Sequence, residues 1–189
     1  VYRCYSMNYS YDVSIILVNY KTNNLVADVV KSIREKSHGF SYEIIIVDNS
    51  ENKFELDKLK AFENEFIHVL DAKSNLGFGK ANNLGATIAQ GKYLYFLNTD
   101  TVLMNNAIFI LKDFLDKNLN VGIVGSNLYT RDGKPNHSFC LKEKNLKNEK
   151  RMNSLISIIK KKIFNRRIDF NFSDSPKKIL GYVCGASLM

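Results

Sequence analysis

Two carboxylates in this chain each follow directly on a short apolar run. In the segment 93–101 the apolar run is followed by Asn98-Thr99-Asp100. The run 43–47 is followed by Asp48. Runs of this length between polar residues predict buried strands of a mostly parallel sheet. The ligand crevice of such a sheet lies outside the carboxyl ends of its strands. Two acids at one sheet edge suit a divalent cation and a nucleotide better than they suit a core.

Each acid has a chemical and a structural interpretation. A hard cation such as Mg²⁺ or Mn²⁺ takes one or two protein carboxylates together with phosphate oxygens, and Asp100 meets that need. The alternative is that Asp100 caps the helix that follows Asn105. Asp48 would accept hydrogen bonds from a base N–H or a ribose hydroxyl. The alternative is that Asp48 or Ser50 caps a helix.

A third motif, residues 75–85, is a glycine-bearing turn that leads into a helix. Gly77 and Gly79 allow close approach of the backbone to a ligand, and a helix start offers free N–H groups to phosphate. Lys80 would add a point charge. Asn82 is a poor helix former in a helical segment, which indicates hydrogen bonding to a ligand, although a solvent-facing asparagine is the open alternative.

The elements that must position these residues alternate along the chain. Apolar spacing predicts strands at 13–18, 43–47, 66–70, 93–97 and 121–124, and helices from Asn23 or Asn24 to 33, at 56–62, 80–90 and 106–117. Strand and helix in this rhythm imply right-handed crossovers and an α/β sheet with helices on both faces.

Composition indicates a globular protein of ordinary size. The chain has 189 residues, of which 45% are hydrophobic and 24% are charged. No apolar stretch approaches the roughly 20 residues of a membrane-spanning helix, and no secretory signal is visible. The three cysteines have no ligand-like spacing, so no zinc site or disulfide framework is predicted and a cytoplasmic location is expected.

The basic charge is regional. Residues 142–178 contain twelve Lys or Arg and four Asp or Glu, a net +8 that equals the net charge of the whole chain. Apolar residues at helical spacing predict a basic amphipathic helix within 150–167, which is typical of contact with a membrane surface or an anionic partner. The open alternative is a solvated insertion. Few aromatics and no known binding module accompany the charge, which argues against nucleic acid.

In their order along the chain, Val13–Tyr20, Ile44–Ser50, Asn75–Gly85 and Phe96–Thr101 closely resemble the family 2 glycosyltransferases of the GT-A fold, rhamnosyltransferase-like enzymes above all. The resemblance spans roughly residues 12–129 and, weakly, 181–189. It implies a Rossmann-like domain that binds a nucleoside-diphosphate sugar. It also implies metal-dependent, inverting transfer of the sugar to the hydroxyl of a carbohydrate or lipid-linked acceptor, at or near the inner face of a membrane, as in bacterial polysaccharide biosynthesis.

The resemblance also implies roles for single residues. Asp100 would ligate Mg²⁺ or Mn²⁺ and Asp48 would hold the base or ribose. The donor nucleotide site is predicted to combine residues at the ends of three strands with residues of the glycine motif. Its members are Asn19, Tyr20, Asp48, Asn75, Gly77, Lys80, Asn82 and Asn98. Two positions depart from the family pattern, because Asn98 stands where many relatives have the first Asp of D-x-D, and Asn82 where some have an Arg.

The family's general base is expected beyond Met189, so we expect a chain truncated before that segment. The expected division is a cloning remnant at 1–6, a nucleotide-sugar-binding α/β domain at 7–141, a basic insertion at 142–178 and the start of an acceptor-side segment at 179–189. Two alternatives stay open: a nucleotide-binding module without catalysis and a sugar-1-phosphate nucleotidyltransferase. A nucleotidyltransferase usually has a Gly- and Arg-rich phosphate loop after the first strand, and this chain has none there. A dinucleotide-dependent oxidoreductase is disfavoured because no G-x-G-x-x-G follows that strand.

Overall fold

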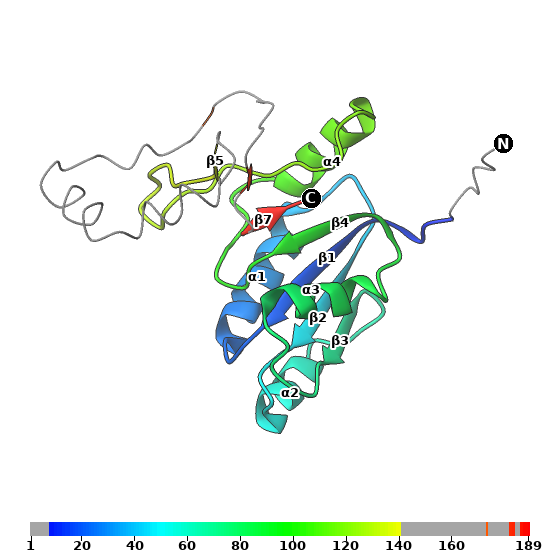
Figure 1. Cartoon of the computed structure of the whole chain (residues 1–189), viewed down its shortest axis with the longest axis vertical. Helices are drawn as coiled ribbons and strands as arrows, with labels where there is room; N and C mark the ends of the chain where they lie inside the picture. Colours follow the sequence, from blue (N-terminus) through cyan, green and yellow to red (C-terminus); the bar gives the residue numbers. More distant parts are fainter. Residues whose placement is uncertain (1–7, 141–172, 174–181, 184–185) are drawn as a thin grey trace, which may run out of the picture. The chain divides into compact units, whose positions relative to one another are not determined.

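The computed structural model describes residues 8–140, 173, 182–183 and 186–189 (Figure 1). The chain divides into two units, Val1–Val124 with Gly185–Met189, and Gly125–Cys184. The predicted amphipathic helix and most of the basic segment 142–178 lie outside the described residues and stay predictions. Within those residues, no helix is long and apolar enough to cross a membrane.

The first unit is built on a five-stranded sheet with the order β3-β2-β1-β4-β7. Strands β1 to β4 are parallel, and β7 is antiparallel to its neighbour β4. The strands are β1 (Tyr11–Asn19), β2 (Tyr42–Asp48), β3 (Ile67–Asp71), β4 (Gly91–Leu97) and β7 (Ser187–Leu188). The mostly parallel sheet and the first four predicted strands are therefore confirmed, whereas the strand predicted at 121–124 is not.

Helices cover both faces of this sheet, as predicted (Figure 1). One core cluster contains buried residues of α1, α2 and α4, and the other contains Ala81 of α3. The helices are α1 (Asn23–Lys36), α2 (Lys53–Lys60), α3 (Phe78–Ala86) and α4 (Ala107–Lys117). Successive residues of the central strand β1 belong to the clusters on opposite faces of the sheet. Ile15 and Leu17 belong to the first cluster and Ile16 to the second. Because both faces are covered, these strands are apolar throughout instead of alternating.

Several predicted boundaries were wrong. Asn23 and Asn24 do not cap α1 but are its first two residues, behind Thr22, which makes no side-chain cap bond. Helix α3 begins two residues early, since Gly77 at φ +77° turns the chain into it, and it ends at Ala86. Residues 121–124 do not form a strand. Val124 alone pairs, exchanging two backbone hydrogen bonds with Met189.

The second unit has a small antiparallel pair, β5 (Phe139–Cys140) with β6 (Tyr182–Val183). The predicted turn at Asp132-Gly133 is present: Gly133 has φ +77° and Tyr129 bridges Pro135 across the turn. The site described next lies wholly within the first unit.

Candidate functional site

The carboxyl edge of the sheet brings together the residues that follow β1, β2 and β4. Asn19 of β1 is in register with Asp48 of β2, which is in register with Asp71 of β3. Three strand-end polar residues therefore stand side by side because parallel strands end at the same edge. Their surroundings give each of the three a different role.

Asp48 is held inside the protein, with 2% of its surface exposed. Its Oδ1 accepts hydrogen bonds from Asn19 Nδ2 at 3.1 Å and from the Ser50 N–H at 3.2 Å, and its Oδ2 accepts one from the Ser50 hydroxyl at 3.1 Å. A buried carboxylate needs such donors to stay in a protein interior. Asp48 caps no helix, because the N-cap of α2 is Asn52, whose side chain accepts from the Phe54 N–H.

Asp71, by contrast, is occupied by a neighbour. Lys73 donates to it through both its ammonium and its backbone N–H, each at 2.7 Å, and these hydrogen bonds lower the pKa of Asp71 below its ordinary value. Asp71 is therefore satisfied without a ligand, although it ends a strand at the same edge.

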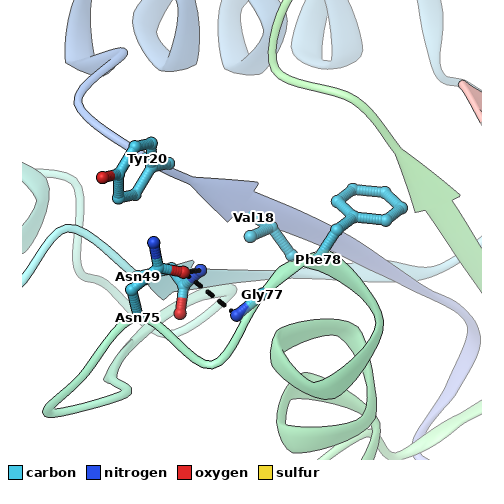
Figure 2. A pocket seen from close by; sticks show the side chains of 6 residues that line it. All are labelled: Val18, Tyr20, Asn49, Asn75, Gly77 and Phe78. Carbon is cyan, nitrogen blue, oxygen red and sulfur yellow. Dashed lines mark hydrogen bonds between the residues drawn. The ribbon is translucent and has the colours of Figure 1, made fainter.

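A pocket of about 260 Å³ opens beside the ends of β1 and β2 (Figure 2). The Asn75 Oδ1 accepts from Asn49 Nδ2 at 2.9 Å and from the Gly77 N–H at 3.0 Å, which fixes one wall. The Asn49 Oδ1 accepts from the Leu76 N–H at 2.8 Å. The pocket is lined by Val18, Tyr20, Asn49, Asn75, Gly77 and Phe78. Three of these, Tyr20, Asn75 and Gly77, belong to the predicted donor site.

Sequence reasoning missed Asn49 and Phe78, and a signal was available for Asn49. Side chains of a strand alternate between faces. Asn49 has the same parity as Val47, which belongs to the core cluster on the α3 face, whereas Asp48 has the opposite parity. The pocket lies on the α3 side with Val18 and Phe78, so Asn49 reaches it directly and Asp48 supports it from behind through Asn19.

Five predicted donor-site residues do not line the pocket: Asn19, Asp48, Lys80, Asn82 and Asn98. Lys80 is exposed in the first turn of α3. Asn82 is nearly buried, and its Nδ2 donates to the Phe78 carbonyl one turn earlier at 3.1 Å. Asn82 therefore uses its amide to support the start of α3, immediately behind the pocket residue Phe78.

Asp100 lies in a tight turn that follows β4. The Thr101 N–H and hydroxyl both donate to the Asn98 carbonyl, and the Asn98 N–H donates to the Ala186 carbonyl at 3.0 Å. Asp100 itself is exposed, and in the part of the chain that the structure describes no basic group lies within 4 Å of its carboxylate. It does not cap α4, whose N-cap is Asn106.

The oxygen atoms of this turn fit a hard divalent cation. Asp100 offers a free carboxylate, and Asn98 Oδ1 is buried without a hydrogen-bond partner among the described residues. No cluster of three or more His, Cys, Asp or Glu occurs among those residues. One carboxylate with neutral oxygens is the donor set of Mg²⁺ or Mn²⁺ sites that share the ion with substrate phosphates.

The turn is tied to the buried acid by a line of hydrogen bonds. The Asn19 Oδ1 accepts from the Thr22 N–H and hydroxyl, each at 3.0 Å, and the Thr22 and Thr99 hydroxyls are 3.2 Å apart. Asn19 also donates to Asp48, so the ends of β1, β2 and β4 share one network. The structure thus brings Asn19, Asp48, Asn98 and Asp100 to one edge, with Asp48 at its buried end and Asp100 at its exposed end.

Comparison with known proteins shows the family and the fold of the chain. The model of the family "Glycosyl transferase family 2" matches residues 14–174. The glycosyltransferase TuaG of Bacillus subtilis (strain 168), named for teichuronic acid biosynthesis, is 30% identical over 130 residues, which are 67% of this chain and 51% of TuaG. The minor teichoic acid biosynthesis protein GgaB of the same organism is 26% identical over 133 residues, or 67% of this chain and 15% of GgaB. The chain therefore spans about half of the first relative's length.

Two solved structures share the fold. S. aureus TarS 1-349 superposes with a TM-score of 0.55 at 17% identity, covering 70% of this chain and 40% of that one. The mannosyltransferase PcManGT from Pyrobaculum calidifontis, solved with GDP-Man and Mn²⁺, gives a TM-score of 0.54 at 17% identity, covering 65% of this chain and 37% of that one. Both have the GT-A fold, and so does the first unit described above.

Proposed function

Because the chain belongs to glycosyl transferase family 2, we propose that it supplies the donor half of an enzyme that moves a sugar from a nucleoside diphosphate to a hydroxyl acceptor. The observation that carries this proposal is the shared network at the carboxyl edge. The turn that carries the exposed carboxylate of Asp100 is hydrogen bonded through Thr99 and Thr22 to Asn19, whose backbone carbonyl accepts from the N–H of the pocket residue Asn49 at 2.8 Å.

The pocket would hold the nucleotide. Tyr20, a residue that is 46% exposed at the pocket wall, would offer the face of its ring for a base to stack on. The amides of Asn49 and Asn75 would present hydrogen-bonding groups to the base or ribose, and Asp48 would hold Asn19 in place from beneath. Lys80, exposed near the start of α3, would meet the diphosphate as a point charge. The GDP-Man bound to PcManGT supports a nucleotide-sugar donor.

Asp100 would ligate the divalent cation, with Asn98 as a neutral oxygen ligand beside it. When bound, the cation stabilises the charge that develops on the departing diphosphate. The protein's own share is to keep the Asp100 turn at a fixed distance from the pocket. The Mn²⁺ present with PcManGT supports this ion or Mg²⁺.

The acceptor would be a carbohydrate or a lipid-linked carbohydrate. The two B. subtilis relatives are named for the biosynthesis of teichuronic acid and of minor teichoic acid, which supports a role in polysaccharide biosynthesis. The basic segment within 150–167 would contact an anionic membrane surface, on its cytoplasmic side. Inversion at the anomeric carbon is implied by the family resemblance and belongs to the same proposal.

Calorimetric titration with UDP and GDP, each with Mn²⁺, Mg²⁺ or EDTA, tests this function. We expect one of the two diphosphates to bind more tightly with Mn²⁺ than with EDTA, and Asp100→Asn to remove most of that gain, about tenfold or more in Kd. Asp71→Asn is the matched control, because Asp71 ends a strand at the same edge but is paired with Lys73. It should leave the gain intact.

Three results would contradict the proposal. No nucleoside diphosphate binding with any ion would remove the donor site. An equal loss in Asp100→Asn and Asp71→Asn would show that any acid at this edge acts through general charge. Tighter binding of UTP or GTP than of the diphosphates would favour a nucleotidyltransferase.

A further inference from the structure

A hydrogen bond between two hydroxyls joins loops that are far apart in the sequence. Thr22 follows β1 and Thr99 follows β4, and their Oγ1 atoms lie 3.2 Å apart across a separation of 77 residues. Thr99 is 9% exposed and Thr22 is partly buried. Neither residue lines the pocket, and neither is one of the acids of the site.

The direction of this bond follows from counting hydrogens. A threonine hydroxyl has one hydrogen to donate. The Thr22 hydroxyl donates that hydrogen to Asn19 Oδ1 at 3.0 Å, so in the Thr22–Thr99 pair Thr99 must be the donor. The order is therefore Thr99 to Thr22 to Asn19, and Asn19 in turn donates to the buried carboxylate of Asp48.

Thr22 contributes unequally to the two ends of this network. Towards Asp48, Asn19 Oδ1 also accepts from the Thr22 backbone N–H at 3.0 Å, so this end has a second bond that does not need the side chain. Towards Asp100, the Thr99 hydroxyl depends on the Thr22 hydroxyl. Loss of the Thr22 hydroxyl would leave a buried donor next to Asp100 without its acceptor, which costs more than the bond itself contributes.

We propose that Thr22 is a positioning residue for the cation site: it holds the Asp100 turn at its working distance from the nucleotide pocket without touching either ligand. The inference rests on the proposed function of Asp100. It also predicts that Thr22 acts on the coupling between cation and nucleotide, and not on nucleotide affinity itself, because the bonds on the Asn19 side survive without its hydroxyl.

The test compares Thr22→Val, which keeps the branched shape and loses the hydroxyl, with Thr22→Ser, which keeps the hydroxyl. The diphosphate that binds the wild type is titrated with Mn²⁺ and with EDTA. The Kd in EDTA divided by the Kd with Mn²⁺ measures the coupling between cation and nucleotide. We expect Thr22→Val to lower this ratio about three- to tenfold, the size of one hydrogen bond. Its Kd in EDTA should stay within about twofold of the wild-type value, and Thr22→Ser should restore the ratio.

Thr99→Val tests the same bond from the other loop, and the double variant completes a cycle. If the two hydroxyls act through each other, the double variant should be no worse than Thr22→Val, since both single variants remove the bond between the two hydroxyls. Additive losses in the ratio would overturn the inference, as would an unchanged ratio in Thr22→Val or an equal loss of affinity in EDTA.

The inference and the function it rests on fail differently. If the wild type shows a gain with Mn²⁺ that Asp100→Asn removes and Thr22→Val retains, the cation site stands and the role of Thr22 is wrong. If the wild type shows no gain with Mn²⁺, the proposed cation site is wrong and the role of Thr22 falls with it.

Discussion

Strand β2 begins and ends near a buried acid, Glu43 at the amino edge of the sheet and Asp48 at the carboxyl edge. Glu43 is 0% exposed, and its Oε1 accepts from the Ser14 hydroxyl and the Gln90 N–H, both at 2.6 Å. The Ser14 hydroxyl in turn accepts from the Gly91 N–H. This network joins β1, β2 and β4 at one edge, as the Asn19–Asp48 network does at the other.

The two edges differ in what lies next to the buried acid. At the amino edge, the neighbouring charges are satisfied within the protein: Asp116 accepts hydrogen bonds from Lys92, Lys112 and Tyr93. At the carboxyl edge, Asp100 is exposed and has no basic partner among the described residues. A buried carboxylate on its own therefore does not mark a ligand site. An unpaired acid on the same frame as a pocket is the feature that separates the two edges.

Glycines at the two edges should give the largest contrast. A Cβ at Gly91 would lie 2.4 Å from the Ser14 backbone nitrogen, so Gly91→Ala should lower the free energy of unfolding by about 3 kcal/mol or more. At Gly77 a Cβ would meet no atom within 4 Å, and the cost of Gly77→Ala, about 1–3 kcal/mol, comes from its φ of +77° alone. Chemical denaturation followed by circular dichroism measures both.

Nucleotide titration of the same variants completes the comparison. Gly77→Ala should weaken nucleotide binding because Gly77 lines the pocket, whereas the folded fraction of Gly91→Ala should bind normally. A Gly91→Ala protein as stable as the wild type would mean that the strands at the amino edge can separate, contrary to the tight register described here.

Amide substitution of the two buried acids should affect different properties: stability at Glu43 and nucleotide binding at Asp48. Glu43→Gln should lower the free energy of unfolding by about 1–2 kcal/mol, since charge-assisted bonds to Ser14 and Gln90 are lost. It should leave nucleotide affinity unchanged. Asp48→Asn should weaken nucleotide binding, because Asp48 orients Asn19, whose carbonyl accepts from the N–H of the pocket residue Asn49. If both variants lose stability and neither loses affinity, the edges are equivalent and the comparison fails.

The contrast between edges also shows how far sequence reasoning reaches. The strands 13–18, 43–47 and 93–97 were predictable because sheets covered on both faces leave continuous apolar runs in the sequence. Alternation along a strand places Asn49 and Asp48 on opposite faces, but strands that are apolar on both faces do not show which face has the pocket, so the sequence analysis does not predict that Asn49 lines it. The Thr22–Thr99 hydrogen bond could not be predicted from a local sequence pattern, because it joins residues 77 positions apart and needs β1 and β4 to pair. The burial of Asp48 likewise depends on Asn19 and Ser50, which fold around it.

The smallest expected effect concerns Asp116 at the amino edge, beside the start of β4. The hydrogen bond from Lys92 and then that from Lys112 lower the pKa of Asp116 well below its ordinary value of 3.8. A group whose pKa is lowered in the folded state contributes stability above its unfolded pKa and loses it as pH falls through the folded value. Because Asp116 is near the surface, with 30% of its side chain exposed, the contribution is about 0.5–1 kcal/mol.

Asp116→Asn should therefore be less stable than the wild type at pH 7 by that amount, and the difference should shrink once the pH falls below about 4. Denaturation at pH 7, 5 and 3 in low salt measures it. Nucleotide binding should not change, because Asp116 forms ion pairs with two lysines at its own edge of the sheet, Lys92 and Lys112. A difference that persists undiminished at pH 3 would mean that Asp116 stabilises the fold through packing. Loss of nucleotide binding would mean that the two ends of β4 communicate, and that the amino edge is part of the site.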